Sequence, residues 1–253
     1  MNNNILKDII ILESIDSTNN YAIEILKRKR LNEGTIIITH EQTKGKGQKG
    51  NYWESEPGKN LTFSLILYPD FLLAEKQFFI TKLVSLALTD FLENYLTDIT
   101  IKWPNDIYYR NKKIAGILIE NAIITVKLKY SVVGIGININ QREFLSGFSN
   151  AISLSKITGK EYDLHKLLIE LKKYLNNRYN QLKNTKITTL NNDYYRKLYR
   201  IGIQSRFISK GATFAGSIKG TTENGKLKIE LNNGEIKLFD FKEVKFANDN
   251  FAG

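Results

Sequence analysis

A short polar segment in the middle of the chain carries the residues best suited to chemistry. The run Lys102-Trp103-Pro104-Asn105-Asp106 follows an apolar stretch, and its proline ends strand pairing and fixes a turn. The amide and carboxylate of this turn either bind a polar ligand at a strand end or form an ordinary Asn-Asp turn. Lys113 begins the next apolar run, and it either reaches a bound anion or extends outward into water.

A loop rich in glycine and lysine offers backbone amides and positive charge to an anion. Residues 45–50 (GKGQKG) fit the GxGxxG pattern of dinucleotide-binding folds, but residues 51–58 do not open the helix which that fold requires. A Walker loop is excluded because Asn51 stands where its lysine should be, and the protein-kinase motifs are missing from the sequence. The loop is therefore interpreted either as an anion-binding loop containing Lys46 and Lys49 or as a solvated surface loop.

Three further segments contain glycines or small polar residues that suit the surroundings of a ligand. Gly116 permits close approach of a ligand to the backbone, or it marks a bulge. In the run 134–140 (GIGININ), Asn138 and Asn140 share one side, and the alternative is a twisted strand ending in an asparagine turn. Residues 17–19 (Ser-Thr-Asn), taken alone, are typical of a helix cap.

The composition excludes several classes of chemistry and favours an anionic partner. The 253 residues include 37 lysines plus arginines against 26 acidic residues, a formal net charge of +11. Because the chain has no cysteine and 2 histidines, disulfides, thiolate metal sites, cysteine nucleophiles and multi-histidine sites are excluded. Any metal is expected to be a hard ion held by oxygen, such as Mg²⁺. No run approaches the roughly 18 apolar residues of a membrane span, so we expect a cytoplasmic protein without membrane association.

The apolar pattern predicts an α+β protein that can position these groups. Strands are expected at 8–13, 35–39, 61–67, 99–103, 107–109, 113–120, 123–129 and 131–139. Helices are expected after Asp16 and Ser17, through 80–95, through 164–175 and around 191–199.

The chain changes character after Gly202. Between residues 206 and 246 short alternating strands are separated by glycines, and the Asn-Gly pairs at 224–225 and 233–234 are hairpin signals. We therefore predict a mixed β-sheet domain with packed helices over residues 1–199, followed by a small SH3-like β-barrel over residues 200–253. The alternative is an extra sheet of the main domain.

In their order along the chain, these segments resemble the biotin–protein ligases. The resemblance is carried by Ser17-Thr18-Asn19, Gln42-Thr43-x-Gly-x-Gly-x-x-Gly, Lys102-Trp103-Pro104-Asn105-Asp106, Lys113-Ile114-Ala115-Gly116-Ile117 and Gly134-Ile135-Gly136-Ile137-Asn138. It implies an ATP-dependent ligase that forms biotinyl-5′-AMP and pyrophosphate. Such a ligase then transfers biotin to one lysine of a biotin carboxyl carrier protein, a subunit of acetyl-CoA carboxylase or of a related biotin-dependent carboxylase. Larger members carry an N-terminal winged helix that binds DNA, but here the pattern starts almost at Met1. We therefore expect a monofunctional ligase without DNA binding.

The resemblance also implies roles for individual residues. Lys113 and Asp106 are the catalytic candidates, and Asp106 is the candidate ligand of Mg²⁺. The implied biotin-binding residues are Ser17, Thr18, Asn19, Gln42, Lys46, Gly47, Gln48, Lys113 and Gly116. The implied residues for ATP and adenylate binding are Gly45, Lys46, Lys49, Trp53, Asn105, Asp106 and Asn138. Gln48 stands where the family often has arginine, and this departure removes a charge beside the adenylate.

Three other interpretations stay open from the sequence. A lipoate–protein ligase shares the catalytic architecture, although residues 102–106, residues 44–50 and the C-terminal barrel favour biotin. A nucleic-acid-binding module agrees with the basic charge, but the lysines are dispersed and the barrel region has no evident aromatic series. A catalytically inert carrier-binding protein is disfavoured because Asp106 and Lys113 are both present. A homodimer through an exposed sheet edge is a further hypothesis.

Overall fold

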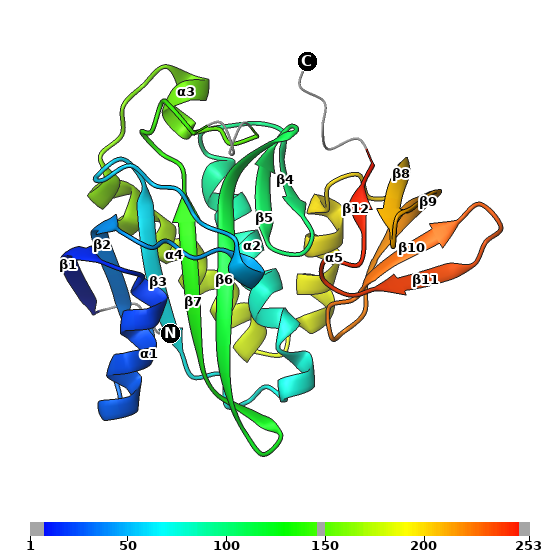
Figure 1. The fold of residues 1–253 in the computed structure, drawn as a ribbon. Coiled ribbons are helices and arrows are strands. Elements are labelled where there is room, and N and C mark those ends of the chain that lie inside the picture. The colour runs from blue at the N-terminus through cyan, green and yellow to red at the C-terminus, as the bar shows by residue number, and fades with distance from the viewer. Residues whose placement is uncertain (1–7, 146–149, 248–253) are drawn as a thin grey trace.

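The computed structural model describes residues 8–145 and 150–247, apart from the side chain of Lys49. Its larger sheet has seven strands in the order β1-β2-β3-β7-β6-β5-β4 (Figure 1). The strands are β1 (Ile9–Ile15), β2 (Ile36–Gln42), β3 (Leu61–Leu67), β4 (Ile99–Lys102), β5 (Asp106–Tyr109), β6 (Lys112–Ile124) and β7 (Lys127–Ile137). β1 and β2 run parallel, and the other neighbouring pairs are antiparallel. The predicted mixed sheet is confirmed.

Helices pack on both faces of this sheet (Figure 1). They are α1 (Thr18–Arg28), α2 (Phe78–Leu92), α3 (Leu154–Thr158), α4 (Leu164–Lys183) and α5 (Ile187–Lys197), with short 3-10 turns at Gln48–Gly50 and Ala74–Lys76. Successive side chains of a strand point to opposite faces. Ile37 and Val132 therefore pack with Ala22 of α1, whereas their neighbours Ile36 and Val133 join the main core on the other face.

The long helices agree with the apolar pattern, with shifted ends. α2 is buried almost all round, and α4 begins with the expected cap, since the Asp163 side chain accepts a hydrogen bond from the Lys166 amide. α5 begins four residues before the predicted start at 191 and ends at Lys197. It ends there because Leu198 turns extended and the Tyr199 amide donates to the Ile101 carbonyl, which ties the chain to β4.

The prediction of three strands at 113–120, 123–129 and 131–139 was wrong. The structure has the two long strands β6 and β7, and the chain reverses direction at Thr125 and Val126, between the paired residues Ile124 and Lys127. Thr125 has a φ of 58°, a conformation usually taken by glycine or asparagine in hairpin turns. A β-branched residue at that position gives no turn signal in the sequence.

The C-terminal part forms a second, antiparallel sheet in the order β11-β10-β9-β8-β12. Its strands are β8 (Gln204–Ser209), β9 (Ala212–Thr221), β10 (Leu227–Leu231), β11 (Ile236–Phe239) and β12 (Lys245–Phe246). Both Asn-Gly hairpins are confirmed, with Gly225 and Gly234 at φ of 95° and 85°. Among the described residues β11 and β12 do not pair with each other, so the sheet is open.

The two sheets share one hydrophobic core. Phe207 and Phe246 of the C-terminal sheet belong to the same buried cluster as Phe78 of α2 and Tyr194 of α5. The indole N–H of Trp103 donates to the carbonyl of Gly225 at 2.9 Å, so the polar turn after β4 is bound to the turn between β9 and β10 of the second sheet. Within residues 8–145 and 150–247, no helix is long and apolar enough to cross a membrane.

Candidate active site

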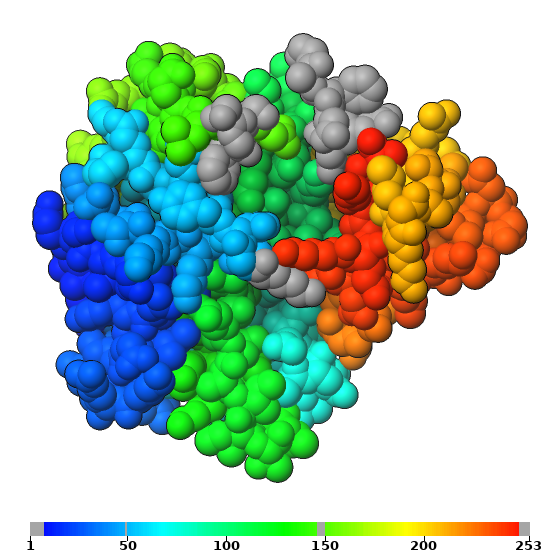
Figure 2. Space-filling view, viewed as in Figure 1, coloured from blue at the N-terminus to red at the C-terminus, as the bar shows by residue number. Residues whose placement is uncertain are grey.

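A cavity of about 500 Å³ lies on the α1 face of the large sheet, under the loop 45–53. In Figure 2 this light-blue loop lies across the green strands β6 and β7, and the red C-terminal segment extends toward it. The cavity brings together most of the predicted site residues: Ser17, Thr18, Asn19, Gln42, Lys46, Gly47, Gln48, Trp53, Asn105, Asp106, Lys113 and Gly116. Segments far apart in the sequence therefore line one space.

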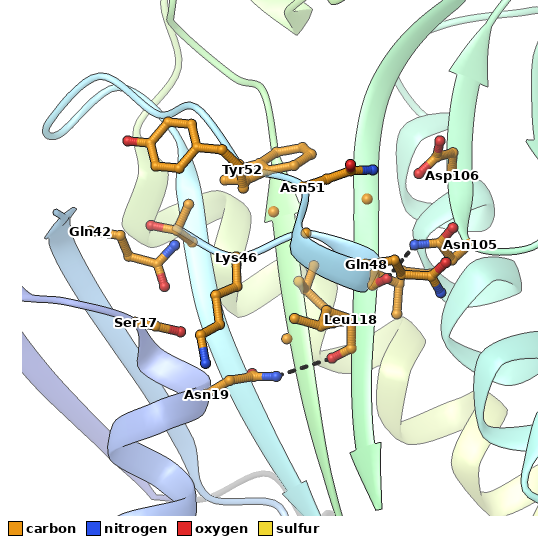
Figure 3. Close-up of a pocket in the computed structure, with 18 of the residues that line it drawn as sticks. Ser17, Asn19, Gln42, Lys46, Gln48, Asn51, Tyr52, Asn105, Asp106 and Leu118 are labelled. Atoms are coloured by element: carbon orange, nitrogen blue, oxygen red, sulfur yellow. Dashed lines mark hydrogen bonds between the residues drawn. The ribbon is translucent and has the colours of Figure 1, made fainter. Parts of the chain in front are cut away.

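The N-terminus of α1 supplies a polar end of the cavity (Figure 3). The side-chain oxygen of Gln42 accepts hydrogen bonds from the Thr18 amide at 2.9 Å and from the Thr18 hydroxyl at 3.1 Å. The carboxylate of Asp16 accepts from the Ser17 amide and from Asn20, and the bond from Asn20 is the main cause of its lowered pKa. These bonds fix the start of the helix at the cavity wall.

Ser64 of β3, which the sequence did not reveal, contacts the lining residues Thr18 and Asn19 without lining the cavity itself. Its hydroxyl oxygen is fully buried and lies 2.8 Å from the Thr18 hydroxyl oxygen and 2.6 Å from the Asn19 side-chain oxygen. The only signal in the sequence is the alternation of Thr62 and Ser64 with apolar residues along an otherwise buried strand. That alternation is compatible with any half-polar strand, so it could not identify the site.

A charged pair forms the other end of the cavity. Lys113 Nζ lies 2.7 Å from Asp106 Oδ1, and the two side chains are 31% and 23% exposed. Asn105 donates to the Ile117 carbonyl at 2.6 Å, and the Ile117 amide donates to the Asn105 carbonyl at 3.0 Å. These bonds fix the turn, and with it Asp106, against β6. An anion bound between the two ends of the cavity would therefore contact the Lys113 ammonium group, which its pairing with Asp106 already holds in position.

Trp53 lies against the glycines of β6 and β7 at the centre of the site. A Cβ atom on Gly136 would come within 2.4 Å of the indole, and one on Gly116 within 2.9 Å, so both strands leave room for this ring. The ammonium of Lys113 lies 5.3 Å from the ring centroid, a cation–π distance. The buried indole N–H of Trp53 has no hydrogen-bond partner among the described residues.

The glycine-rich loop brings Lys46 and Gln48 to the cavity (Figure 3). Lys46 Nζ donates to the Asn20 side chain at 2.5 Å, across the entrance of the cavity from the loop to α1. The loop is closed by a hydrogen bond from the Trp53 amide to the Gly45 carbonyl at 2.9 Å. The side chain of Lys49 lies outside the described residues.

Gly45 and Asn138 are not among the residues that line the cavity. Asn138 is buried, its amide donates to the Ile114 carbonyl, and its side chain donates to the Ile152 carbonyl at 3.2 Å. The Ile152 amide donates in turn to the Lys113 carbonyl. In this structure Asn138 thus supports the backbone that carries Lys113.

Further lining residues were missed by the sequence analysis. Asn51 and Tyr52 line the cavity next to Trp53, and Lys242 reaches it from the turn that follows β11. Asn51 and Tyr52 belong to a segment that the sequence analysis used only to exclude a dinucleotide loop. Lys242 is remote in sequence from every motif, and its place depends on how the C-terminal sheet packs, which no local pattern specifies.

The cavity has few groups that could hold a metal ion. Among the described residues there is no group of three or more histidine, aspartate or glutamate side chains suited to a metal ion. Asp106 is the one carboxylate among the residues that line the cavity, as far as the described chain shows. Mg²⁺ commonly uses one or two carboxylates together with phosphate oxygens and water, and Asp106 fits that pattern.

Comparison with known proteins agrees with this geometry. Residues 11–138, about half of the chain, match the family described as "Biotin/lipoate A/B protein ligase family". The bifunctional ligase/repressor BirA of Bacillus subtilis is 35% identical over 161 residues, which cover 61% of this chain and 48% of that protein. The biotin–[acetyl-CoA-carboxylase] ligase of Paracoccus denitrificans is 32% identical over 133 residues, 51% of this chain and 53% of that protein. The chain spans about half the length of the curated relatives it matches.

Solved structures extend the similarity to the C-terminal sheet. The structure described as biotin protein ligase from Aquifex aeolicus in complex with biotin and ATP is 28% identical, with a TM-score of 0.78. The match covers 95% of this chain and 98% of that one, so it includes both sheets. Together with the family match over residues 11–138, these similarities establish that the chain belongs to the biotin/lipoate A/B protein ligase family.

Proposed function

We propose that this protein is an ATP-dependent ligase that converts biotin to biotinyl-5′-AMP and transfers the biotinyl group to a lysine of a biotin carboxyl carrier protein. The observation that carries the proposal is the two-ended cavity. Its polar end, with Thr18, Asn19 and Gln42, suits a cyclic urea, and its charged end, with Lys113, suits a carboxylate and phosphates. The similarity to a ligase described as being in complex with biotin and ATP supports the same assignment.

The first step is adenylation. A carboxylate oxygen of biotin attacks the α-phosphorus of ATP, the bond to the β-phosphate oxygen breaks, and pyrophosphate leaves. Both reactants are anions, so their approach requires positive charge, which Lys113 and Lys46 supply at the cavity. The ion pair with Asp106 holds the Lys113 ammonium group at the reacting end before substrates bind.

The second step is acyl transfer. The neutral amine of the carrier lysine attacks the acyl carbon of the mixed anhydride, AMP leaves with the bonding electron pair, and the new amide nitrogen loses a proton. No covalent bond to the protein is needed, which agrees with a chain that has no cysteine. The loop 45–53 covers the cavity and limits the access of water to the anhydride.

Mg²⁺ is the cofactor we assign to the adenylation step. Asp106 is the residue that would hold the ion or its water ligands, and the remaining ligands would come from the triphosphate. When bound there, Mg²⁺ would supply positive charge to the phosphates and to the leaving pyrophosphate. Removal of divalent ions with EDTA should abolish adenylation, and readdition of Mg²⁺ should restore it.

ATP–pyrophosphate exchange, run separately with biotin, lipoate and octanoate, tests the proposal. Exchange that depends on biotin alone would establish the reaction and its acid together. Exchange with lipoate instead would place the protein with the lipoate ligases of the same family. Folded protein that exchanges with none of these acids in the presence of Mg²⁺ would refute adenylation and favour an inert carrier-binding role.

The remaining partners follow from this function. The acceptor is a biotin carboxyl carrier protein of acetyl-CoA carboxylase or of a related carboxylase, and the reaction takes place in the cytoplasm. DNA binding is not part of the function, and electrophoretic mobility shifts with DNA and RNA at micromolar protein and low salt would test this. A shift that weakens steeply with salt would favour the nucleic-acid alternative.

We also propose a division of the chain into a ligase domain over residues 1–199 and a small domain of SH3-like type over residues 200–253, whose sheet is open among the described residues. The strand order of the C-terminal sheet and the stacking of Phe214 on Phe207 and on Phe239 support a curved sheet around an aromatic core.

A homodimer would form through β1, which is an edge strand with Ile11 75% exposed. Light scattering with and without biotin and ATP tests the dimer, and a monomer under both conditions would contradict it.

A further inference from the structure

Glu120 of β6 contacts the polar end of the cavity from outside it. The side-chain amide of Asn19 donates to the Glu120 carboxylate at 2.8 Å and to the Leu118 carbonyl at 3.2 Å (Figure 3 shows the second bond). Asn19 and Leu118 line the cavity, whereas Glu120 is not among its lining residues. Among the described residues, Asn19 therefore links Glu120 to a ligand in the cavity.

The carboxylate of Glu120, together with the Leu118 carbonyl, determines which way the Asn19 amide faces. The Glu120 carboxylate oxygen and the Leu118 carbonyl oxygen both accept from Asn19, so both face its NH₂ group. The opposite orientation would place the Asn19 oxygen against the carboxylate and its NH₂ group against Ser64, which lies 2.6 Å from the present Asn19 oxygen. With Glu120 in place, the Asn19 oxygen is fixed toward Ser64 as an acceptor.

The same reasoning extends along a row of oxygen atoms. Asn19 Oδ1, Ser64 Oγ, Thr18 Oγ1 and Gln42 Oε1 follow one another at 2.6, 2.8 and 3.1 Å. Gln42 Oε1 is also an acceptor, because the Thr18 amide donates to it at 2.9 Å. The Ser64 and Thr18 hydroxyl groups supply one proton each to a row with three contacts between oxygens. The row therefore has fewer protons than contacts. Ser64 is not among the lining residues, so it is the oxygens of Asn19 and Thr18, which line the cavity, whose lone pairs favour N–H donors from a ligand.

We propose that Glu120 is a positioning residue that makes this end of the cavity an acceptor wall for the N–H groups of a cyclic urea. The inference rests on the proposed function and deepens it, because it names the source of selectivity for an acid with a urea ring over one without N–H donors. A site built to hydrogen-bond a substrate group rejects strongly the analogue that lacks it. Lipoate has no N–H group and would leave the acceptor row unfilled.

Gly134 of β7 supports the same geometry. A Cβ atom at this position would come within 2.6 Å of Asn19 Oδ1 and 3.1 Å of its amide nitrogen. The absence of a side chain at Gly134 therefore leaves the space in which the Asn19 amide lies. A Gly134→Ala variant should displace the amide without touching Glu120, so it provides an independent way to disturb the acceptor row.

Calorimetric titration with biotin and with lipoate tests the proposal, using the full chain and three variants. Glu120→Met removes the shorter of the two hydrogen bonds that orient Asn19, and we expect biotin binding to weaken about 10- to 100-fold. Glu120→Gln keeps an oxygen that can accept from Asn19, and it should bind biotin within about threefold of the wild type. Glu24→Met, which removes an exposed carboxylate from the same helix as Asn19, should bind like the wild type.

Kinetics separate positioning from a general structural effect. In Glu120→Met the KM for biotin in ATP–pyrophosphate exchange should rise, while the KM for ATP and kcat at saturating biotin stay close to wild type. The preference for biotin over lipoate should fall in the same variant. Unchanged biotin binding in Glu120→Met, or a Glu120→Gln variant that is as weak as Glu120→Met, would overturn the role of Glu120.

A readout without substrate distinguishes this inference from the proposed function. The side-chain NH₂ signals of Asn19 in ¹⁵N spectra should exchange slowly in the wild type and in Glu120→Gln, and faster in Glu120→Met and Gly134→Ala. Wild-type protein that binds no biotin would overturn the proposed function and leave the Asn19 signals as the test of Glu120. Signals that are identical in all variants would overturn the orienting role even if biotin binds.

Discussion

Lys113 Nζ and Asp106 Oδ1 lie 2.7 Å apart on the neighbouring strands β6 and β5. Both strands are anchored in the core, since Ile107 and Ile114, the residues next to this pair, are fully buried. The ammonium group is thus held at the cavity by a rigid sheet. In the proposed reaction this arrangement places a positive charge where the carboxylate and the α-phosphate meet.

Replacement of Lys113 should impair adenylation strongly. Lys113→Ala is expected to lower the rate of ATP–pyrophosphate exchange by at least about 100-fold, the scale of one lost electrostatic contact to a transition state. Lys112→Ala removes an exposed lysine at the preceding position of the same strand and should leave the rate near wild type. Near-normal initial rates in Lys113→Ala would exclude the lysine from the reaction.

An arginine at position 48 should strengthen retention of the adenylate. Gln48 lines the cavity but offers no charge, whereas an arginine there could make charge-assisted hydrogen bonds to the phosphate. Gln48→Arg is therefore expected to slow release of biotinyl-5′-AMP about tenfold in a filter-binding or fluorescence chase. Gln48→Met, similar in length and uncharged, is the control, and equal release from both variants would contradict the prediction.

A side chain at Gly136 should displace Trp53. The Cβ of Gly136→Ala would come within 2.4 Å of the indole, so the ring must move, and we expect a loss of about 1–3 kcal/mol in the free energy of unfolding. Urea unfolding and tryptophan emission would measure the loss and the displacement. In a protein that already carries Trp53→Ala, the Gly136→Ala substitution should no longer lower the free energy of unfolding. A penalty that persists without Trp53 would have another cause.

Lys82 should make the stability of the protein depend on pH. This lysine is 1% exposed among aromatic rings, donates to Asn191 at 2.7 Å, and has its pKa lowered to about 8, chiefly by burial. Between that value and the ordinary pKa of lysine, the unfolded chain binds more protons than the folded one, so stability rises with pH.

Comparison with Lys82→Met isolates this effect. The free energy of unfolding of the wild type should rise by about 2 kcal/mol relative to the variant between about pH 7 and pH 9.5. The measurements are made below the pH range in which the buried tyrosines ionise. A difference between the two proteins that does not change with pH would show that the lysine keeps its ordinary pKa in the folded state.

Arg178 of α4 should be a major contributor to stability. Its guanidinium group, 14% exposed, lies 2.7 Å from Asp90 of α2 and 2.7 Å from Asp193 of α5. Arg178→Met leaves two partly buried carboxylates without their cation and should cost about 3 kcal/mol, measured by urea unfolding. Arg196→Met removes a 75% exposed arginine that lies 3.6 Å from Asp193 and should change stability by less than about 0.5 kcal/mol.

The parts of the site that could be predicted from sequence are those fixed by local structure. Asn105, Asp106 and Lys113 lie within a single turn and hairpin, so their spacing already limits how far apart they can be. Ser17 to Asn19 begin a helix, as their residue types indicate. In these cases a short segment of the sequence determines both the residue type and its position relative to its neighbours.

The parts that could not be predicted depend on contacts between distant segments. Ser64 and Glu120 contact the first residues of α1 because β3 and β6 lie on either side of β7, and no local pattern specifies that arrangement. The turn at Thr125 was missed because a β-branched residue takes a conformation more usual for glycine. Closure of the predicted barrel depends on pairing between β11 and β12, which sequence periodicity does not determine.

The hydrogen bond from Trp103 to Gly225 has a consequence for how the molecule unfolds. The same turn carries Asp106 at the cavity, and Phe207 and Phe246 belong to one core with Phe78 of α2, a helix that packs on the larger sheet. The two sheets therefore lack the independent cores that separate melting requires. Heating should produce a single cooperative transition, and backbone amides of the two sheets should become open to solvent exchange together.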